Sequence, residues 1–467
     1  MHDSRCVRLG AAWVLSLSWA SWARSARADP PPLSPPPPPW IAGKPRLHDE
    51  EIRKKVEGSY PAGLPLLDAD PDTGYGGGGR AYYYFNGSRA DPLFEYTPYR
   101  HRIYIQIFAT NKGFQDHQID YEWLYVGDSP VRFRATALIA ANASANYFGV
   151  GSDSMRDLTS PSTGAGFERY SDYVDALRRV DIFGRTFASY NQYDYLSPAA
   201  RMRVDRDFFG GLVRAQAAIQ IGHTRIRDVT GLRVSADASD GSSTTAISQP
   251  TKLHQDCALG RVVGCAGGWD NRIKLGVAYD SRDFEPDPNA GMFVELASEF
   301  GTRALGSSFD YARVTFSPHV YWSPLPELAD VVVAARFLVN AQSSVPFFDM
   351  DTLSSTVEDT HGLGGSRTLR GYRLDRFVGP VALLANAEVR WTMFDFKAWE
   401  QWFAFALVPF VDFGRVFDSF SDVTLRGMRR GQGAGLRVAW NQSTIGAFDL
   451  GFSSEGTAFY TEFNHPF

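Results

Sequence analysis

The chain has little cysteine, no long apolar run beyond its N-terminus and no excess of positive charge. Of its 467 residues only 3 are cysteine, and its 47 lysines and arginines are outnumbered by 52 aspartates and glutamates. A formal net charge of -5 argues against nucleic acid as a partner, because nucleic-acid-binding proteins need a basic surface. A membrane-spanning helix needs about 20 apolar residues in succession. The sequence therefore excludes a nucleic-acid-binding protein and a membrane protein built of helices.

Familiar catalytic and cofactor motifs are also missing. The chain has no G-x-S-x-G, no H-E-x-x-H and no nucleotide-binding loop, and its 9 histidines are scattered without metal-ligand spacing. The stretch "DADPDTGYGGGG" resembles a calcium loop only in part, since Thr73 and Gly79 stand where such a loop has glycine and glutamate. We expect no enzymatic activity, no metal and no cofactor.

The N-terminus has the pattern of an export signal. Arg5 and Arg8 precede the apolar run "LGAAWVLSLSWASWA", and Ala26-Arg27-Ala28 follows it. A basic end, a short apolar core and an A-x-A site predict a secretory signal peptide over residues 1–28.

Two further features suit an exported chain. Residues 29–60 begin with "DPPPLSPPPPP", which predicts a proline-rich periplasmic linker, and a short charged helix is expected at about 47–57. Cys257 and Cys265 lie eight positions apart in a polar segment. Because exported proteins fold in an oxidising compartment, we expect these two cysteines to form a structural disulfide.

Residues 61–467 consist of short runs in which apolar and polar residues alternate. In "VALLANAEVRWTMF" the polar positions are Asn386, Glu388 and Arg390, and in "WFAFALVPFVDFG" Asp412 lies opposite an aromatic and aliphatic face. Period-two alternation predicts strands with one dry face and one wet face. A soluble sandwich and a membrane barrel both satisfy this pattern.

The barrel is favoured because the alternation continues for about 400 residues without a domain break, longer than a sandwich core usually runs. Two long polar segments, residues 228–268 and 343–363, suit exterior loops. The predicted fold class is all-β, a transmembrane antiparallel β-barrel of about 16 strands over residues 61–467, with a loop inside its lumen.

The stretch "GGSRTLRGYRLDRF", Gly364 to Phe377, is too basic and glycine-rich to make a good strand. If this loop folds back into a barrel, Arg370 can meet Glu388 and Asp412, which both fall on the wet faces of their strands. A guanidinium suits that role because its planar fork binds a carboxylate through two hydrogen bonds. The alternative is a solvated basic loop on the surface.

The loop also resembles a known family. "GLGGSRTLRGY" is similar to the signature of the BamA/TamA-type superfamily, the bacterial surface antigen barrels. Further stretches resemble that family in the expected order. "NYFGVGSDS" resembles its early glycine-rich strand and "LGVAYDSRDFEPDPNAGMFVELASEF" its D-x-R-D…P…G hairpin. "ANAEVRW", "VPFVDFGRVFD", "GQGAGLRVAW" and the closing "FNHPF" follow.

The resemblance implies roles for individual residues. The lumenal loop motif corresponds to Gly364, Gly365, Arg370, Gly371 and Tyr372, and its partners on the barrel wall to Glu388, Phe410, Asp412 and Gly435. Phe463 and Phe467 correspond to the C-terminal signal that the barrel-assembly machinery reads during biogenesis.

The chain departs from the family in one respect. Members that insert or export proteins carry POTRA modules before the barrel, and the stretch between residues 29 and 61 is too short for one. Fold and location are nevertheless expected to follow the family, in the outer membrane of a Gram-negative bacterium and in contact with its lipid.

The activity implied by the resemblance is assisting insertion or passage of a protein or lipid substrate. Two alternatives stay open from the residues alone: a passive diffusion channel with the same shell, and a secreted enzyme on a soluble β scaffold.

Overall fold

The computed structural model describes residues 36–44, 46–47, 52–53, 55–283, 287–325, 330–398, 401–440, 444–463 and 465–467. The predicted signal peptide, the start of the proline-rich linker and part of its expected helix lie outside these residues. No helix in the described part of the chain is long and apolar enough to cross a membrane.

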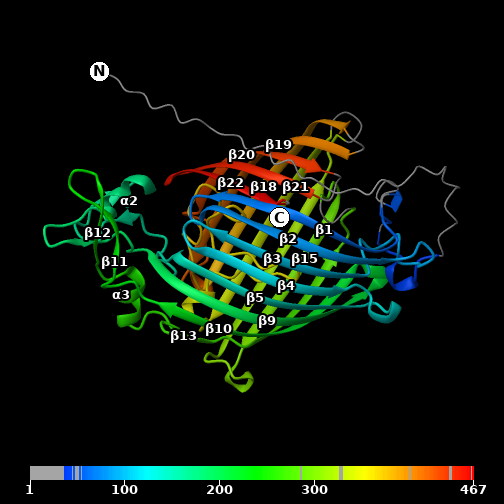
Figure 1. Cartoon of the computed structure of the whole chain (residues 1–467), viewed down its shortest axis with the longest axis horizontal. Helices are drawn as coiled ribbons and strands as arrows, with labels where there is room; N and C mark the ends of the chain where they lie inside the picture. The colour runs from blue at the N-terminus through cyan, green and yellow to red at the C-terminus, as the bar shows by residue number, and fades with distance from the viewer. Residues whose placement is uncertain are drawn as a thin grey trace.

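Sixteen antiparallel strands follow one another around a barrel (Figure 1), which confirms the predicted fold class and strand number. The barrel strands are β1 (Gly58–Asp70), β2 (Gly74–Gly87), β3 (His101–Thr110), β4 (Phe114–Trp123), β5 (Val131–Asn146), β9 (Gln192–Phe208), β10 (Val213–Arg227), β14 (Arg272–Asp280), β15 (Gly291–Gly301), β16 (Tyr311–Trp322), β17 (Val331–Ser343), β18 (Val381–Ala398), β19 (Gln401–Phe417), β20 (Arg429–Trp440), β21 (Thr444–Ser453) and β22 (Gly456–Phe463). A further short strand, β13 (Gly267–Trp269), continues the wall beside β10.

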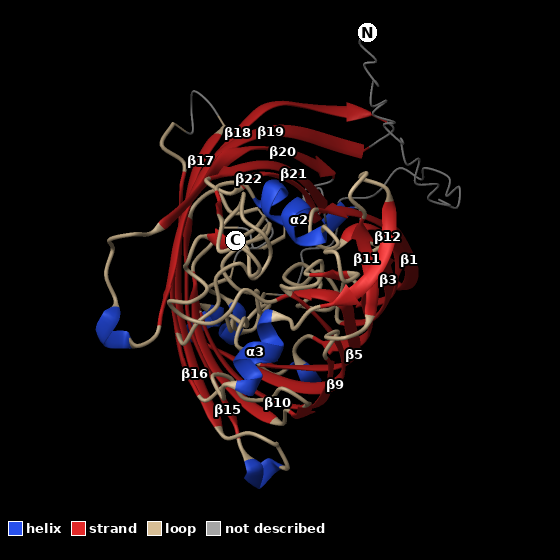
Figure 2. Ribbon diagram, turned by 90° about the vertical axis from the view of Figure 1, so that its left-hand side faces the viewer, coloured by secondary structure: helices blue, strands red, loops and turns tan. Residues whose placement is uncertain are grey.

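An even number of strands places both ends of the barrel at the same opening, which we call the terminal mouth. The three long connections, residues 147–191, 228–271 and 344–380, all leave the opposite opening, the loop mouth. The first two carry a cap of small elements (Figures 1 and 2): β6 (Leu158–Thr159), β7 (Gly166–Phe167), α2 (Tyr170–Arg178), β8 (Arg185–Thr186), β11 (Arg233–Asp237), β12 (Ser243–Ser248) and α3 (Lys252–Ala258). Single 3-10 turns complete the list: η1 (Pro39–Ile41), η2 (Val126–Asp128), η3 (Phe209–Gly211), η4 (Arg303–Leu305), η5 (Phe347–Asp349) and η6 (Phe420–Asp422).

The wall is apolar outside and polar inside. In β15 the inward Glu295 and Glu299 are 4% and 0% exposed, whereas the outward Leu296 and Phe300 are 41% and 42% exposed. Such a strand is stable only if its outer face meets lipid and its inner charges find partners in the lumen.

The connection 344–380 packs inside the lumen rather than extending from the loop mouth. Its apolar residues form a core with the inner wall: Leu353, Leu363, Leu369, Tyr372 and Phe377 from the loop pack with Leu338, Ala382, Leu384 and Val416 from β17, β18 and β19. The loop is therefore a packed plug, which disfavours the alternative of a solvated basic loop.

The stretch "NYFGVGSDS" is not the strand that its family resemblance predicts. β5 ends at Asn146, and the residues that follow turn inward to the plug, where the N–H of Gly151 donates to the carbonyl of Val378 at 2.8 Å. The hydroxyl of Ser154 donates to the carbonyl of Gly151 at 2.8 Å. The glycines allow two loops to approach closely there, so the strand that the resemblance predicts for this stretch was wrong.

The first and last strands meet without a backbone ladder in the described part of the chain. Among the described residues, the hydrogen bonds between the two strands are made by one side chain: the hydroxyl of Thr461 in β22 donates to Asp68 at 2.9 Å and accepts from the N–H of Ala69, also at 2.9 Å. The junction of β1 and β22 is therefore a seam, held less firmly than the fifteen laddered strand pairs around the rest of the wall.

The segment before β1 is fixed to the terminal mouth. The N–H of Gly43 donates to the carbonyl of Gly210 at 2.7 Å, and Lys44 pairs with Asp280 at 2.9 Å. Closer to β1, Lys55 donates to the carbonyl of Thr97 at 2.6 Å, and the carbonyl of Val56 accepts from Asn86 at 2.7 Å. The start of β1 is thus tied to the connections that follow β2 and β9.

Candidate functional site

Arg370, at the tip of the plug, points its guanidinium at the wall formed by β18, β19 and β21. Nε and Nη2 donate to the two carboxylate oxygens of Asp412 at 2.8 and 2.9 Å, and Nη1 donates to Glu388 at 2.8 Å and to Asp449 at 3.1 Å. The ring of Phe410 lies under the guanidinium, 3.4 Å from its central carbon to the ring centroid. The guanidinium is thus bound by three carboxylates and one aromatic face, all buried.

Charge is balanced at this site, which we call the Arg370 site. Three guanidinium groups, those of Arg370, Arg390 and Arg437, share three carboxylates, those of Glu388, Asp412 and Asp449. A buried charge without a partner is costly, so removing one member destabilises the others. Burial lowers the affinity of Arg370 for its proton, but the surrounding carboxylates more than offset this and raise the pKa of its guanidinium.

Glycine allows the loop to reach the wall. Gly371 has φ +97°, and a Cβ there would lie 2.7 Å from the carbonyl carbon of Phe452. A Cβ on Gly431 in β20 would lie 2.0 Å from the carbonyl oxygen of Arg370. The backbone of the loop therefore touches the backbone of the wall, and larger residues at these positions would push the guanidinium away from its partners.

The rest of the predicted loop motif supports the turn that presents Arg370. Gly364 and Gly365 have φ +130° and +82°, and the N–H of Gly365 donates to the carbonyl of Tyr372 at 3.1 Å. Tyr372 is 1% exposed, and its ring lies 5.1 Å from that of Phe377. The carbonyl of Tyr372 accepts a hydrogen bond from Tyr460 of β22 at 3.0 Å.

Gly435, predicted as a wall partner, affects Arg370 indirectly, through Asp449. A Cβ on it would lie 1.8 Å from a carboxylate oxygen of Asp449 and 2.5 Å from a guanidinium nitrogen of Arg437. It leaves room for that ion pair, and Asp449 in turn contacts Arg370. The structure thus brings Glu388, Phe410 and Asp412 directly to Arg370, and Gly435 only through Asp449.

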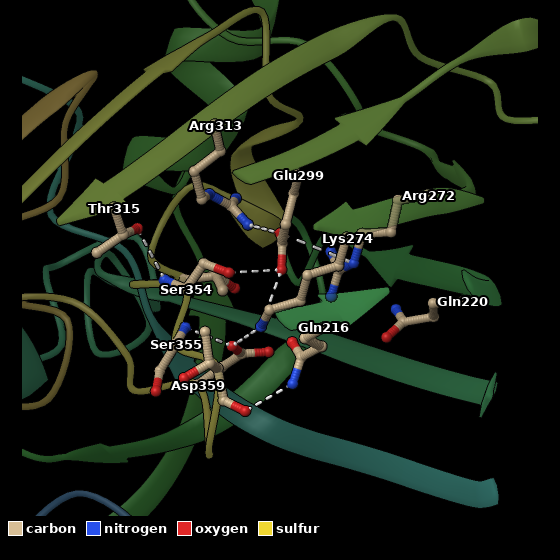
Figure 3. A network of polar contacts seen from close by, with 12 residues as sticks. Gln216, Gln220, Arg272, Lys274, Glu299, Arg313, Thr315, Ser354, Ser355 and Asp359 are labelled. Carbon is tan, nitrogen blue, oxygen red and sulfur yellow. Dashed lines mark hydrogen bonds and ion pairs between the residues drawn. The ribbon is translucent and has the colours of Figure 1, made fainter. Parts of the chain in front are cut away.

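A second group of charges holds the first half of the plug against β14, β15 and β16 (Figure 3). Asp349 pairs with Arg272 at 2.7 Å and with Arg313 at 2.8 Å, and both arginines also approach Glu299. Asp359 of the plug pairs with Lys274. The plug is therefore fastened to two parts of the wall, and the sequence analysis identified only one of them.

Several of these partners carried a signal in the sequence. Arg272, Lys274, Glu295 and Glu299 occupy alternate positions of their strands, as lumenal charges must. Which loop residue meets each of them depends on how the plug folds inside the lumen, and alternation says nothing about that.

Two further contacts of the plug were not predicted: the ion pair of Arg376, and the packing of the predicted disulfide on the plug. Arg376, 2% exposed, pairs with Glu455 between β21 and β22 at 2.8 Å. The predicted disulfide partners Cys257 and Cys265 are bonded in the structure, and they pack with Phe347 of the plug. The cap, the plug and the last strands thus contact one another at the loop mouth.

The two C-terminal aromatics lie in different surroundings. Phe463 ends β22, with its ring centroid 5.9 Å from the guanidinium carbon of the lumenal Arg80. Phe467 lies across the lumen from the seam, packed on Tyr321, Val332 and Ala334 of β16 and β17. The predicted assembly-signal role of both residues stays a prediction.

In the described part of the chain, no three histidine, cysteine, aspartate or glutamate side chains are grouped as metal ligands would be. The arrangement supports attachment of a loop to a wall rather than chemical turnover.

A shell of strands that is closed except at the seam, apolar outside and charged inside, with an even strand number and long loops at one mouth only, defines an outer-membrane β-barrel of a Gram-negative bacterium. In this class the terminal mouth faces the periplasm and the loop mouth faces the exterior.

Comparisons with known proteins agree with that class. The family model described as "Omp85 superfamily domain" matches residues 171–456, and a domain of unknown function (DUF5982) matches residues 37–100. No curated protein sequence matches the chain.

Solved structures show a similar fold. BamA from Haemophilus ducreyi lacking POTRA domains 1–3 is 11% identical, with a TM-score of 0.50 over 88% of this chain and 70% of that one. CdiB from Escherichia coli is 10% identical, with a TM-score of 0.47 over 89% of this chain and 68% of that one.

Since the first of these family models covers more than half of its length, the chain belongs to the Omp85 superfamily. The predicted family resemblance is confirmed, and so are the outer-membrane location and the absence of an enzyme class, because Omp85 barrels are not enzymes.

Proposed function

We propose that this barrel assists the insertion or passage of protein or lipid at the outer membrane, and that the substrate uses the seam between β1 and β22. The observation that carries the proposal is the seam itself, where one threonine side chain replaces the backbone ladder found between the other neighbouring strands. A laddered pair must break many hydrogen bonds to separate, whereas this junction must break few.

The filled lumen supports the same conclusion. Arg370, Leu363, Leu369 and Phe377 of the plug are all 1% exposed or less. A solute crossing the barrel along its axis would have to displace this packed loop and its buried ion pairs. Passage along the wall avoids that cost, which is why we favour assisted insertion over passive diffusion.

Partners follow from the same proposal. Outer-membrane lipid would contact the apolar outer wall, the barrel-assembly machinery would act on the chain during its own biogenesis, and a protein or lipid substrate would meet the seam.

A disulfide across the seam tests the proposal. The double variant Asp68→Cys/Thr461→Cys joins two side chains that are hydrogen-bonded at 2.9 Å. In a strain depleted of the native protein, we expect this variant to leave the outer membrane short of the substrate proteins or lipids, and a mild reductant to restore them. The measurement is a census of outer-membrane proteins and lipids before and after reduction.

The matched control is Gln106→Cys/Gln118→Cys, which joins directly opposed residues of the laddered pair β3–β4. With this control, the census of outer-membrane proteins and lipids should be normal both before and after reduction. Normal function of the oxidised seam variant, with the cross-link verified, would contradict passage through the seam.

A further inference from the structure

Two positions on the seam edge of β1 cannot donate a backbone hydrogen bond. The N–H of Ala69 donates to Thr461 of β22, so the backbone of Ala69 faces the seam. Successive residues of a strand present their backbone groups to opposite edges, and the register of β1 against β2 is unbroken after its first residue. The odd-numbered residues from 59 to 69 therefore face the seam. Pro61 and Pro65 are among them, and proline has no N–H.

These prolines oppose the addition of a strand to this edge. A free strand edge invites pairing through its N–H and C=O groups, and proteins often place proline on an edge to prevent it. Within the described residues β1 pairs with β2 alone, and both prolines are exposed. A polypeptide that added to β1 would lack two ladder hydrogen bonds and would meet two rings. The seam edge of β1 is therefore a poor template for an incoming β-strand.

A lumenal cation lies over the same stretch of the seam. Arg80 of β2 is paired in register with Leu64 of β1, and its guanidinium carbon is 5.9 Å from the ring centroid of Phe463, the last residue of β22. The side chain of Arg80 therefore extends across β1 to the seam. Its Nε donates to the neutral amide oxygen of Gln106 at 2.7 Å, and among the described residues no carboxylate lies within ion-pair distance of it. This guanidinium has capacity for an anion.

The outer face beside the two prolines is nearly bare. Gly63 of β1 and Gly79 of β2 face outward, and a Cβ at either position would meet only a backbone carbonyl oxygen, at 3.6 and 3.9 Å. No side chain therefore covers this stretch. Leu67, on the same face, is 57% exposed. Because the outer wall meets lipid, acyl chains can lie directly against the backbone of β1 and β2.

We propose that the substrate that crosses the seam is a phospholipid, whose phosphate contacts Arg80 from the lumenal side while its acyl chains stay in the membrane against the bare outer face. Pro61 and Pro65 set this specificity, because they keep β1 from pairing with an added strand. The inference rests on the proposed function, since it names the substrate of the same seam. A polypeptide strand is disfavoured because it would need the donors that the prolines lack, whereas a lipid needs no backbone ladder.

Lipid transfer between leaflets tests the proposal. The folded barrel is reconstituted into liposomes with phosphatidylethanolamine labelled on an acyl chain, and dithionite reports how fast the label reaches the outer leaflet. We expect faster transfer than in liposomes without protein. Oxidised Asp68→Cys/Thr461→Cys should return the rate to that of empty liposomes, and reduction should restore it. Arg80→Gln should slow transfer about tenfold, as expected for loss of one hydrogen-bonded ion pair.

The controls separate headgroup recognition from a general effect on the barrel. A labelled neutral glycolipid has no phosphate, so its transfer should be the same with Arg80→Gln as with the native protein. Arg203→Gln alters a lumenal arginine of β9, paired with Asp205 on another part of the wall, and should leave both rates unchanged. Heat-modifiable mobility on gels confirms that each variant is folded.

A second measurement tests the role of the prolines. The probe is a fluorescent peptide with the sequence of β15, residues 291–301, titrated against the folded barrel in detergent. We expect Pro61→Val/Pro65→Val to bind this strand at least about tenfold more tightly than the native barrel, because two ladder donors are restored. The matched control is Pro409→Val, at an exposed proline of β19 inside the laddered wall, which should not change binding.

Absence of phospholipid transfer by the native barrel would overturn the proposal, and so would equal slowing of both lipids by Arg80→Gln. Binding of the strand peptide to the native barrel as tightly as to the proline variant would overturn it in favour of a polypeptide substrate. A normal census with the oxidised seam variant would refute the proposed function. A deficient census without phospholipid transfer by the native barrel would refute this inference alone.

Discussion

At the scale of single residues, Arg370 shows how one side chain can fix a loop. Each of its three nitrogens donates to a carboxylate, and its planar face rests on Phe410. Lysine has the same charge but a single donor group, so it cannot reproduce both the paired bonds to Asp412 and the stacking.

We expect Arg370→Glu to destabilise the folded barrel by about 3–5 kcal/mol, because it leaves three buried carboxylates without their shared cation. Arg370→Lys should cost less. Adding Glu388→Arg or Asp412→Arg to Arg370→Glu should restore part of the loss. The measurement is the urea midpoint of heat-modifiable mobility, with the exposed Arg303→Glu as a control that should change nothing.

Asp349 provides a prediction about pH. Burial by itself would raise the pKa of this loop carboxyl, but Arg272 and Arg313 beside it outweigh burial and lower the pKa to about 2. The stabilisation from this carboxylate is therefore complete above the unfolded pKa of about 4 and is lost as the pH falls from about 4 to 2.

We expect the urea midpoint of the native barrel to fall over that acidic range more steeply than that of Asp349→Asn, which has no carboxyl to protonate. Parallel curves for the two proteins between pH 4 and 2 would contradict a role for Asp349 in holding the plug.

At the scale of secondary-structure elements, alternation predicted the strands and their inward faces. Asn386, Glu388 and Arg390 were assigned to the wet face of β18, and all three are buried in the lumen. The prediction succeeds because a strand between lipid and a polar interior has only two faces.

Contacts between elements were harder to predict. Asp449 binds Arg370 from β21, but its distance from the loop depends on the stagger of β20 and β21, which a single sequence does not contain. The position of Phe467 was also missed, since residues after the last strand follow no period. Helix α2 lies in the connection 147–191, where the sequence analysis predicted no helix.

The small disulfide loop is an element that can be tested alone. Bonding of Cys257 to Cys265 closes a loop that packs on the plug, where the N–H of Phe347 donates to the carbonyl of Val263 at 3.0 Å. In the chain-entropy model, a disulfide that closes a loop of this length stabilises the folded loop by about 2–3 kcal/mol.

We expect Cys257→Ser/Cys265→Ser to speed tryptic cleavage after Arg261, inside the loop, while the gel mobility of the folded barrel is unchanged. Cleavage after Arg303, in a separate exposed turn, is the internal control. Unaltered cleavage at Arg261 would indicate that packing alone holds the loop.

At the scale of the whole molecule, the plug is the feature on which the choice between an assisted route and a pore can be tested. It is fastened at the Arg370 site and again at Asp349 and Asp359, on different parts of the wall. Because the loop is held at both places, we expect it to obstruct the passage of a solute through the lumen.

In planar bilayers we expect the native barrel to give small, irregular openings and Arg370→Glu to give larger and longer ones. Arg303→Glu should behave like the native protein. Large, steady, ohmic openings of the native barrel would favour the passive diffusion channel instead.

The hydrogen bonds of Lys55 and Val56, just before β1, affect which strand can move at the seam. They hold the start of the first strand against neighbouring parts of the barrel at the periplasmic rim. The last strand has one laddered neighbour, β21, and among the described residues its other hydrogen bonds are side-chain contacts to β1 and to the plug. If the seam opens as proposed, we expect β22 rather than β1 to move, because fewer backbone hydrogen bonds and terminal contacts hold it.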